Sequence, residues 1–136
     1  MSKNKHNSAV GSTVERSDER INETQEVFTP MELVFRMIHD IPAEKLSDPN
    51  STFLDNSCGS GNFLAGLLTV LTEEYGHDKQ HVLDNMIFGI DLMEDNVIET
   101  CERLGVEYGH PHFVCANALT YDYSFGEPTG VEALWA

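Results

Sequence analysis

The most informative stretch of the sequence lies at residues 52–68 and reads TFLDNSCGSGNFLAGLL. Its first four residues favour a β-strand that ends on a carboxylate, Asp55. Gly59 and Gly61 follow in a turn, where glycine permits a tight backbone and the close approach of a ligand. From Asn62 onward, apolar residues recur at the spacing of a helix. We therefore predict a strand, a glycine turn and a helix in direct succession.

Strands and helices alternate on both sides of this stretch. Upstream, Thr29 is suited to cap a helix whose first residue is Pro30. Residues 42–51 contain two prolines and are expected to form a loop, and residues 1–24 a disordered, mobile arm. Right-handed strand–helix–strand crossovers then predict an α/β fold, with a mostly parallel three-stranded sheet and helices on both faces. The expected helices span residues 30–40, 62–75 and 95–104, with a helical turn at 81–85, and the expected strands span 52–55, 86–91 and 112–116.

Length and composition place the chain among globular proteins. Its 136 residues suffice for one domain, which we place at residues 25–136. Apolar residues make up 40% and charged residues 23%, which excludes collagen-like and wholly disordered proteins. No apolar run approaches the roughly 20 residues of a membrane span, and the N-terminus does not resemble a secretory signal. Cys58, Cys101 and Cys115 match neither a disulfide framework nor a zinc pattern, so we expect a reduced, cytoplasmic protein without a membrane partner.

The charge is strongly negative and unevenly distributed. Asp and Glu number 23 against 8 Lys and Arg, a net charge of −15, and residues 21–136 hold only four of those bases against 20 acids. Proteins that hold nucleic acid through its phosphates need Lys and Arg. Direct DNA contact would therefore require the N-terminal arm or a partner. We favour a solvated acidic surface over the alternative, a surface that binds basic proteins by resembling DNA.

Each expected strand ends in a polar or glycine-rich turn, and parallel sheets bind ligands at the carboxyl ends of their strands. The turn lacks the Gly-Lys-Ser or Gly-Lys-Thr of a P-loop, and Leu64 stands where a dinucleotide fingerprint has its third glycine. Asp55 would repel phosphate and attract an ammonium group. The helix N-terminus at Asn62 suits a carboxylate. These features predict the amino acid end of a ligand.

The second and third strands predict the rest of that ligand. A carboxylate at Asp91 is suited to a ribose diol, and Leu92 and Met93 would lie beside a base. The Asn117 amide can pair with an adenine edge. An amino acid, a ribose and an adenine without phosphate together describe S-adenosylmethionine.

Four segments resemble the first motifs of adenine-N6 DNA methyltransferases, most closely those of restriction–modification systems: EVFTP at 26–30, DNSCGSGNFL at 55–64, GID at 89–91 and NAL at 117–119. The resemblance covers roughly residues 24–122. It implies a truncated, Rossmann-like class I methyltransferase fold in a bacterial or phage-infected cell. It also implies that Phe28, Thr29 and Pro30 cap the methionine end of the cofactor. The cofactor-binding residues that we predict are Phe28, Thr29, Pro30, Asp55, Cys58, Gly59, Gly61, Asn62, Phe63, Asp91, Leu92, Asn117, Ala118 and Leu119.

The chain departs from this family at the catalytic motif, Asn-Pro-Pro-aromatic, which holds the flipped adenine and its amine. None of the five prolines is followed by another, and Glu127-Pro128-Thr129 is the nearest approach to the motif. We therefore expect a module that binds S-adenosylmethionine and is not catalytic by itself. One alternative is a DNA adenine methyltransferase subunit that a second chain completes. The other is an acidic anti-restriction or inhibitor protein that binds a basic, DNA-binding partner.

The resemblance also bears on partners, because the family's fourth strand would lie beside the first and is expected to be missing here. An unpaired strand edge recruits other strands or must be covered. We expect residues 119–136 to cover it, or another chain, a second copy or a different protein, to pair there. Tyr121, Tyr123, Phe125 and Trp135 are expected to serve this cover rather than to stack on a base.

Two further features have ordinary interpretations that we favour. His110 and His112 have a spacing that could bind metal, but no third ligand is near in sequence, and a loop is expected. Cys58 precedes a helix N-terminus, which can lower a thiol pKa, but a small packed side chain is expected.

Overall fold

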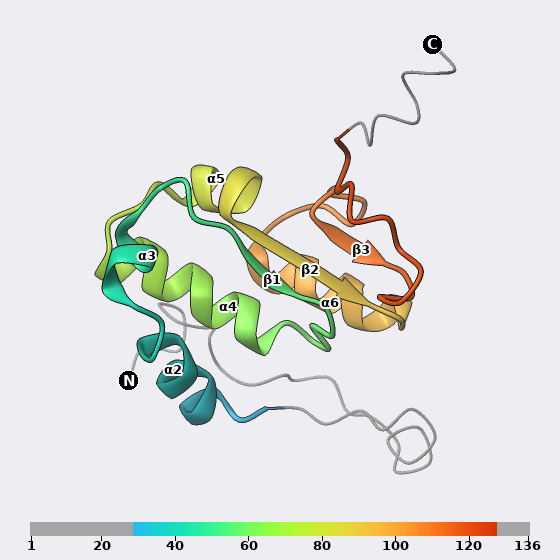
Figure 1. Cartoon of the computed structure of the whole chain (residues 1–136). Coiled ribbons are helices and arrows are strands. Elements are labelled where there is room, and N and C mark those ends of the chain that lie inside the picture. Colours follow the sequence, from blue (N-terminus) through green and yellow to red (C-terminus); the bar gives the residue numbers. More distant parts are fainter. Residues whose placement is uncertain (1–28, 128–136) are drawn as a thin grey trace.

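The computed structural model of the chain describes residues 29–127. The expected arm at residues 1–24, Phe28 and residues 128–136 lie outside the described residues. Helices and strands alternate along the chain, as Figure 1 shows. The elements are α2 (Met31–His39), α3 (Ala43–Ser47), β1 (Phe53–Asp55), α4 (Asn62–Thr69), the π-helical segment η2 (Val70–Glu74), α5 (Lys79–His81), the π-helical segment η3 (Val82–Met86), β2 (Ile87–Asp91), α6 (Glu94–Leu104) and β3 (Phe113–Cys115).

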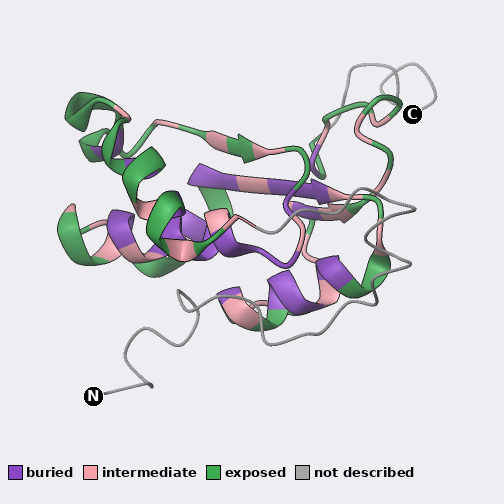
Figure 2. Cartoon of the chain, turned by 90° about the horizontal axis from the view of Figure 1, so that it is seen from below, coloured by how far each residue is buried: buried purple, intermediate pink, exposed green. Residues whose placement is uncertain are grey.

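The three strands form one parallel, open sheet in the order β1-β2-β3. Leu54 is paired with Phe88, Asp55 with Gly89, and Asp91 with Cys115. The central strand is almost wholly enclosed, whereas the middle residue of β1 is exposed (Figure 2). The prediction of an α/β fold with a three-stranded parallel sheet flanked by helices is confirmed.

Helix α4 connects β1 to β2, and helix α6 connects β2 to β3. Both helices pack on the same face of the sheet (Figure 1). A Cβ atom placed on Gly89 would lie 2.5 Å from Cδ1 of Leu64 in α4. Phe113, the β3 partner of Gly89, belongs to the same buried cluster as Val97 of α6. The strands lie side by side in chain order, so both connections cross the sheet in the same direction. Because both crossovers are right-handed, their helices lie on the same side. The described helices therefore differ from our expectation of cover on both faces.

Helix α2 packs on α4 at Gly66, where an added Cβ would lie 2.8 Å from Cγ1 of Val34. The helix begins one residue later than expected. Its N-cap is Pro30, whose carbonyl accepts the backbone N–H of Val34 at 3.0 Å. Thr29 is thus not the cap: Pro30 has an extended ψ of 145°, so it stands outside the helix as the N-cap while its carbonyl accepts the first helical hydrogen bond.

Residues 42–51, expected to be a loop, contain the short helix α3. Pro42 is its N-cap, and the Pro42 carbonyl accepts the N–H of Lys45 at 2.9 Å. Leu46 is buried and fixes α3 on the core. A buried leucine thus converts a proline-rich connection into a helical turn.

The opposite face of the sheet is covered by the chain after β3 rather than by a described helix. The ring of Phe125 lies 5.0 Å from the ring of Phe88 in β2. Residues 119–127 form no strand beside β1, and the rest of the predicted cover lies outside the described residues. Pairing of another chain with β1 stays a prediction. No helix in the described part of the chain is long and apolar enough to cross a membrane.

Candidate functional site

The turn between β1 and α4 depends on its two glycines. Gly59 has φ +54° and Gly61 has φ +94°, in the left-handed region that glycine adopts without a steric penalty. A Cβ on Gly61 would also lie 2.9 Å from Oγ1 of Thr100 in α6. Conformation and close packing both require glycine at position 61.

Asp91, the last residue of β2, holds this turn. Its Oδ1 accepts the N–H of Gly59 at 3.1 Å, and its Oδ2 accepts the N–H of Met93 at 2.9 Å and Nδ2 of Asn96 at 3.0 Å. A carboxylate offers about four acceptor positions. These three donors leave about one position, so Asp91 has room for one ribose hydroxyl rather than for both of a diol.

The ends of the three strands are joined through backbone hydrogen bonds. The N–H of Cys58 in the turn donates to the carbonyl of Ile90 at 2.9 Å, and the N–H of Ala116 donates to the carbonyl of Asp91 at 3.0 Å. The turn after β1 and the segment after β3 are therefore both attached to the end of β2.

Asn62, the first residue of α4, links the turn to the segment before α2. Its Nδ2 donates to the carbonyl of Thr29 at 2.8 Å. Its Oδ1 accepts Nη1 of Arg103 at 2.6 Å, and the same nitrogen donates to the carbonyl of Ser60 at 3.0 Å. The Thr-Pro segment and the glycine turn, 25 residues or more apart in the sequence, therefore lie side by side.

Helix α6 contributes a polar face that the sequence analysis did not identify. Asn96 donates to Asp91, Oγ1 of Thr100 donates to the carbonyl of Gly59 at 3.2 Å, and Arg103 holds the next part of the turn. Their spacing of four and three residues places these side chains on one side of a helix. Polar residues at this spacing, beside the apolar ones, were the signal that could have identified them.

Two cavities lie beside the turn, with volumes of about 240 and 50 Å³. Both are lined by Thr29, Asp55, Ser57 and Phe63. The larger is below the roughly 300 Å³ at which small-molecule sites begin, so it can enclose only part of a cofactor. The smaller cavity is also lined by Cys58, Gly59 and Asn62, which were predicted to bind the cofactor, and by Ser60 of the same turn.

The other predicted residues lie outside these two cavities. Leu92 and Leu119 are 64% and 93% exposed. Oδ1 of Asn117 accepts the N–H of Leu119 at 2.9 Å, and the half-buried Ala118 offers its carbonyl to the hydroxyl of Tyr123 at 2.6 Å. The end of β3 is thus close to β2 but exposed. The structure gathers the residues predicted for the amino acid end more tightly than those predicted for the adenine.

The electrostatics of the turn favour a positively charged group. Burial raises the pKa of Asp55, an effect that the hydrogen bond from Ser57 opposes and the nearby charge of Asp91 reinforces. Burial also raises the pKa of Cys58, and both carboxylates add to that shift. The alternative of a lowered Cys58 pKa is wrong, because burial and the two carboxylates outweigh the helix N-terminus, and the thiol stays protonated.

One buried polar atom at the turn lacks a partner. Oγ of Ser60 is enclosed and has no hydrogen-bond partner among the residues that the structure describes, although Ser60 lines the smaller cavity. An unmet hydroxyl on a residue that lines the same cavity as Asp55 fits a ligand with both donors and acceptors, as an amino acid has. The turn therefore has the chemistry to hold a small group with both charges, such as an amino acid.

The histidines between α6 and β3 lie away from this turn. Nε2 of His110 is 3.3 Å from Oδ1 of Asp84. Within residues 29–127, no group of three His, Cys, Asp or Glu side chains is arranged to hold a metal ion.

In comparisons with protein-family models, with curated proteins and with solved structures, nothing matches the chain. The resemblance to adenine-N6 methyltransferases thus rests on the sequence motifs.

Proposed function

We propose that the chain binds S-adenosylmethionine at the carboxyl ends of β1, β2 and β3, as the cofactor-binding part of a Rossmann-like class I methyltransferase domain. The observation that carries this proposal is the hydrogen bond from the Gly59 amide to Asp91. It joins the glycine turn to the second strand, and the backbone bond from Ala116 adds the third strand at the same residue. Three turns with complementary chemistry therefore adjoin one another.

Each part of the cofactor has a partner in this arrangement. The ammonium group lies by Asp55, where a positive charge offsets two neighbouring carboxylates, and the hydroxyl of Ser60 meets the amino acid. The methionine chain packs against Thr29 and Phe63. Asp91 accepts one ribose hydroxyl. The base lies toward the exposed side chain of Leu92, beyond the enclosed part of the site.

Cofactor binding does not by itself supply methyl transfer to DNA. S-adenosylmethionine, when bound, supplies an electrophilic methyl group, but an adenine amine needs hydrogen-bond acceptors that draw its lone pair out of the ring. The sequence has no adjacent prolines of the kind that the family's catalytic motif uses. We therefore propose that this chain alone binds the cofactor without transferring the methyl group.

Isothermal titration of the full chain tests cofactor binding. S-adenosylmethionine and S-adenosylhomocysteine should bind, whereas ATP should not, because its phosphates would meet Asp55 and Asp91. Asp91→Ala should weaken binding about tenfold or more, since hydrogen bonds to charged groups contribute about 1.5–3 kcal/mol. Glu44→Ala, which removes one exposed charge on α3, should bind as the parent does. Absence of heat with a folded chain, or equal affinity for ATP, would refute the proposal.

A second candidate is the adenine methyltransferase subunit completed by another chain. One observation favours it: β1 pairs with β2 alone among the described strands, so its other edge is available to a further strand. Labelled S-adenosylmethionine and duplex DNA, incubated with this chain and the products of neighbouring genes, should yield labelled N6-methyladenine. Label that appears without this chain, or never, would exclude the subunit role.

A further inference from the structure

A cavity of about 560 Å³ lies between the sheet and the chain that follows β3. Leu54 and Phe88, which are paired in neighbouring strands, line it from the sheet face opposite α4. Tyr123 and Phe125 line it from the chain after β3, and the ring of Phe125 lies 5.0 Å from that of Phe88. The volume falls within the roughly 300–1,000 Å³ that is typical of small-molecule sites.

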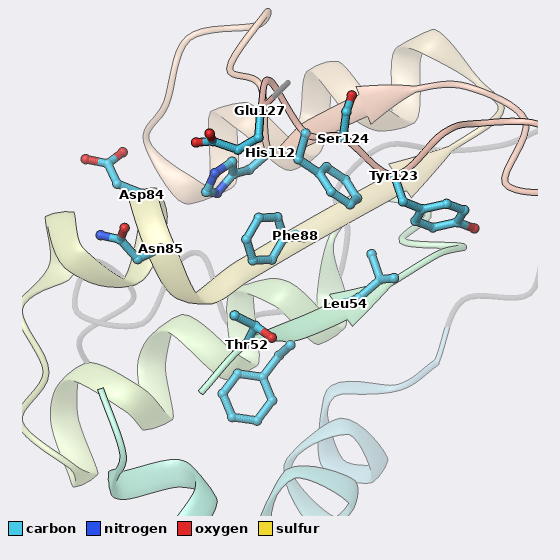
Figure 3. A pocket seen from close by; sticks show the side chains of 11 residues that line it. Thr52, Leu54, Asp84, Asn85, Phe88, His112, Tyr123, Ser124 and Glu127 are labelled. Carbon is cyan, nitrogen blue, oxygen red and sulfur yellow. The ribbon is translucent and has the colours of Figure 1, made fainter. Parts of the chain in front are cut away.

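The two ends of this cavity differ in chemistry, as Figure 3 shows. The carboxylates of Asp84 and Glu127 lie toward one end. Leu54 and Tyr123 lie at the other end, and the ring of Phe88 lies between the two groups. The cavity is therefore acidic at one end and aromatic and apolar at the other.

The described lining of the cavity carries negative charge only. It contains the carboxylates of Asp84 and Glu127 and no Lys or Arg. Hydrogen bonds from Gln80 and His110 lower the pKa of Asp84, so this carboxylate is ionised at neutral pH. Burial, and then the nearby His110, lower the pKa of His112, so its imidazole is largely uncharged at pH 7. The lining therefore disfavours an anion and favours a cation.

Two aromatic residues of the wall have an unfavourable backbone conformation. Tyr123 has φ +58° and Phe125 has φ +46°, in the left-handed region that bulky side chains rarely adopt. Two tyrosine hydroxyls hold this conformation: that of Tyr121 accepts the N–H of Phe125 at 2.9 Å, and that of Tyr123 donates to the carbonyl of Ala118 at 2.6 Å. Strained residues cluster at functional sites, including ligand-binding ones, and both of these line the cavity.

We propose that this cavity binds a small aromatic molecule that carries one positive charge, of the arylamidine or arylalkylamine class. Its ring packs against Phe88 and Phe125, where contact between rings adds stabilisation beyond the apolar area that is buried. Its charged group lies at the end that holds Asp84 and Glu127. This inference goes beyond cofactor binding, because Leu54 is the only described residue that lines both this cavity and one at the glycine turn.

Three probes of nearly identical shape test the proposal: benzamidine, benzamide and benzoate, which are cationic, neutral and anionic at pH 7. Each is titrated into the full chain, labelled with carbon-13 in its aromatic rings and free of cofactor, and binding is followed by NMR. Benzamidine should bind most tightly and benzoate least. The ring signals of Phe88, Tyr123 and Phe125 should shift as benzamidine is added.

Variants at the acidic end test the role of charge. Glu127→Gln should weaken benzamidine binding about two- to fivefold, as expected for the loss of one exposed charge partner, and should leave benzamide binding unchanged. Glu44→Gln, which removes one exposed carboxylate on α3, should change neither affinity.

Variants that add a bulky ring test the location. Thr52 is an exposed residue that lines the cavity, so Thr52→Trp should fill part of it and weaken the binding of benzamidine and benzamide alike. Ser47→Trp, at an exposed residue of α3, should leave both unchanged. Asp91→Ala should also leave benzamidine binding unchanged, so a failure of the cofactor proposal would be distinguishable from a failure of this one.

Four results would overturn the proposal. Benzamidine that does not bind, or that binds no more tightly than benzoate, would show that the cavity does not select a cation. Full binding to Thr52→Trp with a native circular dichroism spectrum would place the probe elsewhere, and if that variant does not fold, unchanged binding to Glu127→Gln would decide against the proposal. Displacement of benzamidine by S-adenosylmethionine would show that the two sites are not separate.

Discussion

Two effects make it unfavourable for Asp55 to carry its negative charge. Burial is the larger one, and the nearby charge of Asp91 is the other, so both raise the pKa of Asp55. Its folded-state pKa lies above the ordinary 3.8, so between those two pKa values the folded protein binds more protons than the unfolded chain. The contribution of this group to stability therefore falls as pH rises through that window. A carboxylate that costs stability in this way is typical of a binding residue.

We predict that Asp55→Asn raises the free energy of unfolding at pH 7 while weakening S-adenosylmethionine binding about tenfold or more. The amide keeps an oxygen for the Ser57 N–H and loses only the charge. Urea unfolding and isothermal titration measure the two effects. The gain in stability should shrink as pH falls toward 3.8.

Asp122→Asn is the matched control for this substitution. Both aspartates accept the backbone N–H two residues further along the chain: Asp55 that of Ser57 and Asp122 that of Ser124, each at 3.1 Å. Unlike Asp55, Asp122 is exposed. It should change neither quantity. A less stable Asp55→Asn protein at pH 7 would contradict the assigned cost of the charge.

The sequence predicted those site residues whose type and position along the chain by themselves indicate a role. Carboxylates at the ends of strands and glycines in the following turn could be placed because strand ends meet at one edge. The spacing of Thr100 and Arg103 marks a polar side of the helix, but their partners could not be predicted, because these include backbone carbonyls of a distant turn. The backbone carbonyl that a side chain meets depends on how two helices pack, and that packing is absent from a local pattern.

The contact between α4 and the sheet is tight enough to exclude a methyl group. We predict that Gly89→Ala destabilises the protein by about 1–3 kcal/mol, because its Cβ would lie 2.5 Å from the fully buried Leu64. Chemical denaturation of Gly89→Ala, Leu64→Ala and the double variant measures the coupling. The second substitution should relieve the first, so strictly additive losses would show that this contact does not set the cost.

The polar side of α6 holds the glycine turn through Arg103. We predict that Arg103→Met lowers the free energy of unfolding by about 1.5–3 kcal/mol, since it removes charged hydrogen bonds to the Ser60 carbonyl and to Asn62. Arg103→Lys should recover part of the loss. Arg36→Met, on the exposed side of α2, should have little effect. Equal stability of Arg103→Met and Arg36→Met would mean that the turn does not depend on α6.

Helices and strands with a strong apolar period were predictable within one to a few residues, as α6 and its Gly105 cap illustrate. The helix α3 was missed because its one buried contact, Leu46, gives no period. The cover of the sheet was misjudged for a different reason. Alternation of strands and helices predicts crossovers, but only the strand order says on which face each helix lies, and that order is a long-range property.

The whole chain repels itself electrostatically at neutral pH. Its net charge is −15, and residues 21–136 contribute four bases and 20 acids. A large net charge favours solubility and opposes compaction. Acids such as Glu44, Glu102 and Asp122 lie exposed on separate elements, so the repulsion is spread over the surface rather than confined to one site.

We predict that the thermal midpoint rises with salt. The Debye length falls from about 30 Å at 0.01 M to about 10 Å at 0.1 M, so most of the repulsion across a molecule of this size should be screened within that range. Thermal unfolding followed by circular dichroism at constant pH measures the shift, and NaCl and KCl should act alike because screening depends on ionic strength alone. Paired surface charges would respond in the opposite sense. A midpoint that falls with added salt would therefore show that specific ion pairs outweigh the net repulsion. The net charge would then not be what limits the stability of the fold.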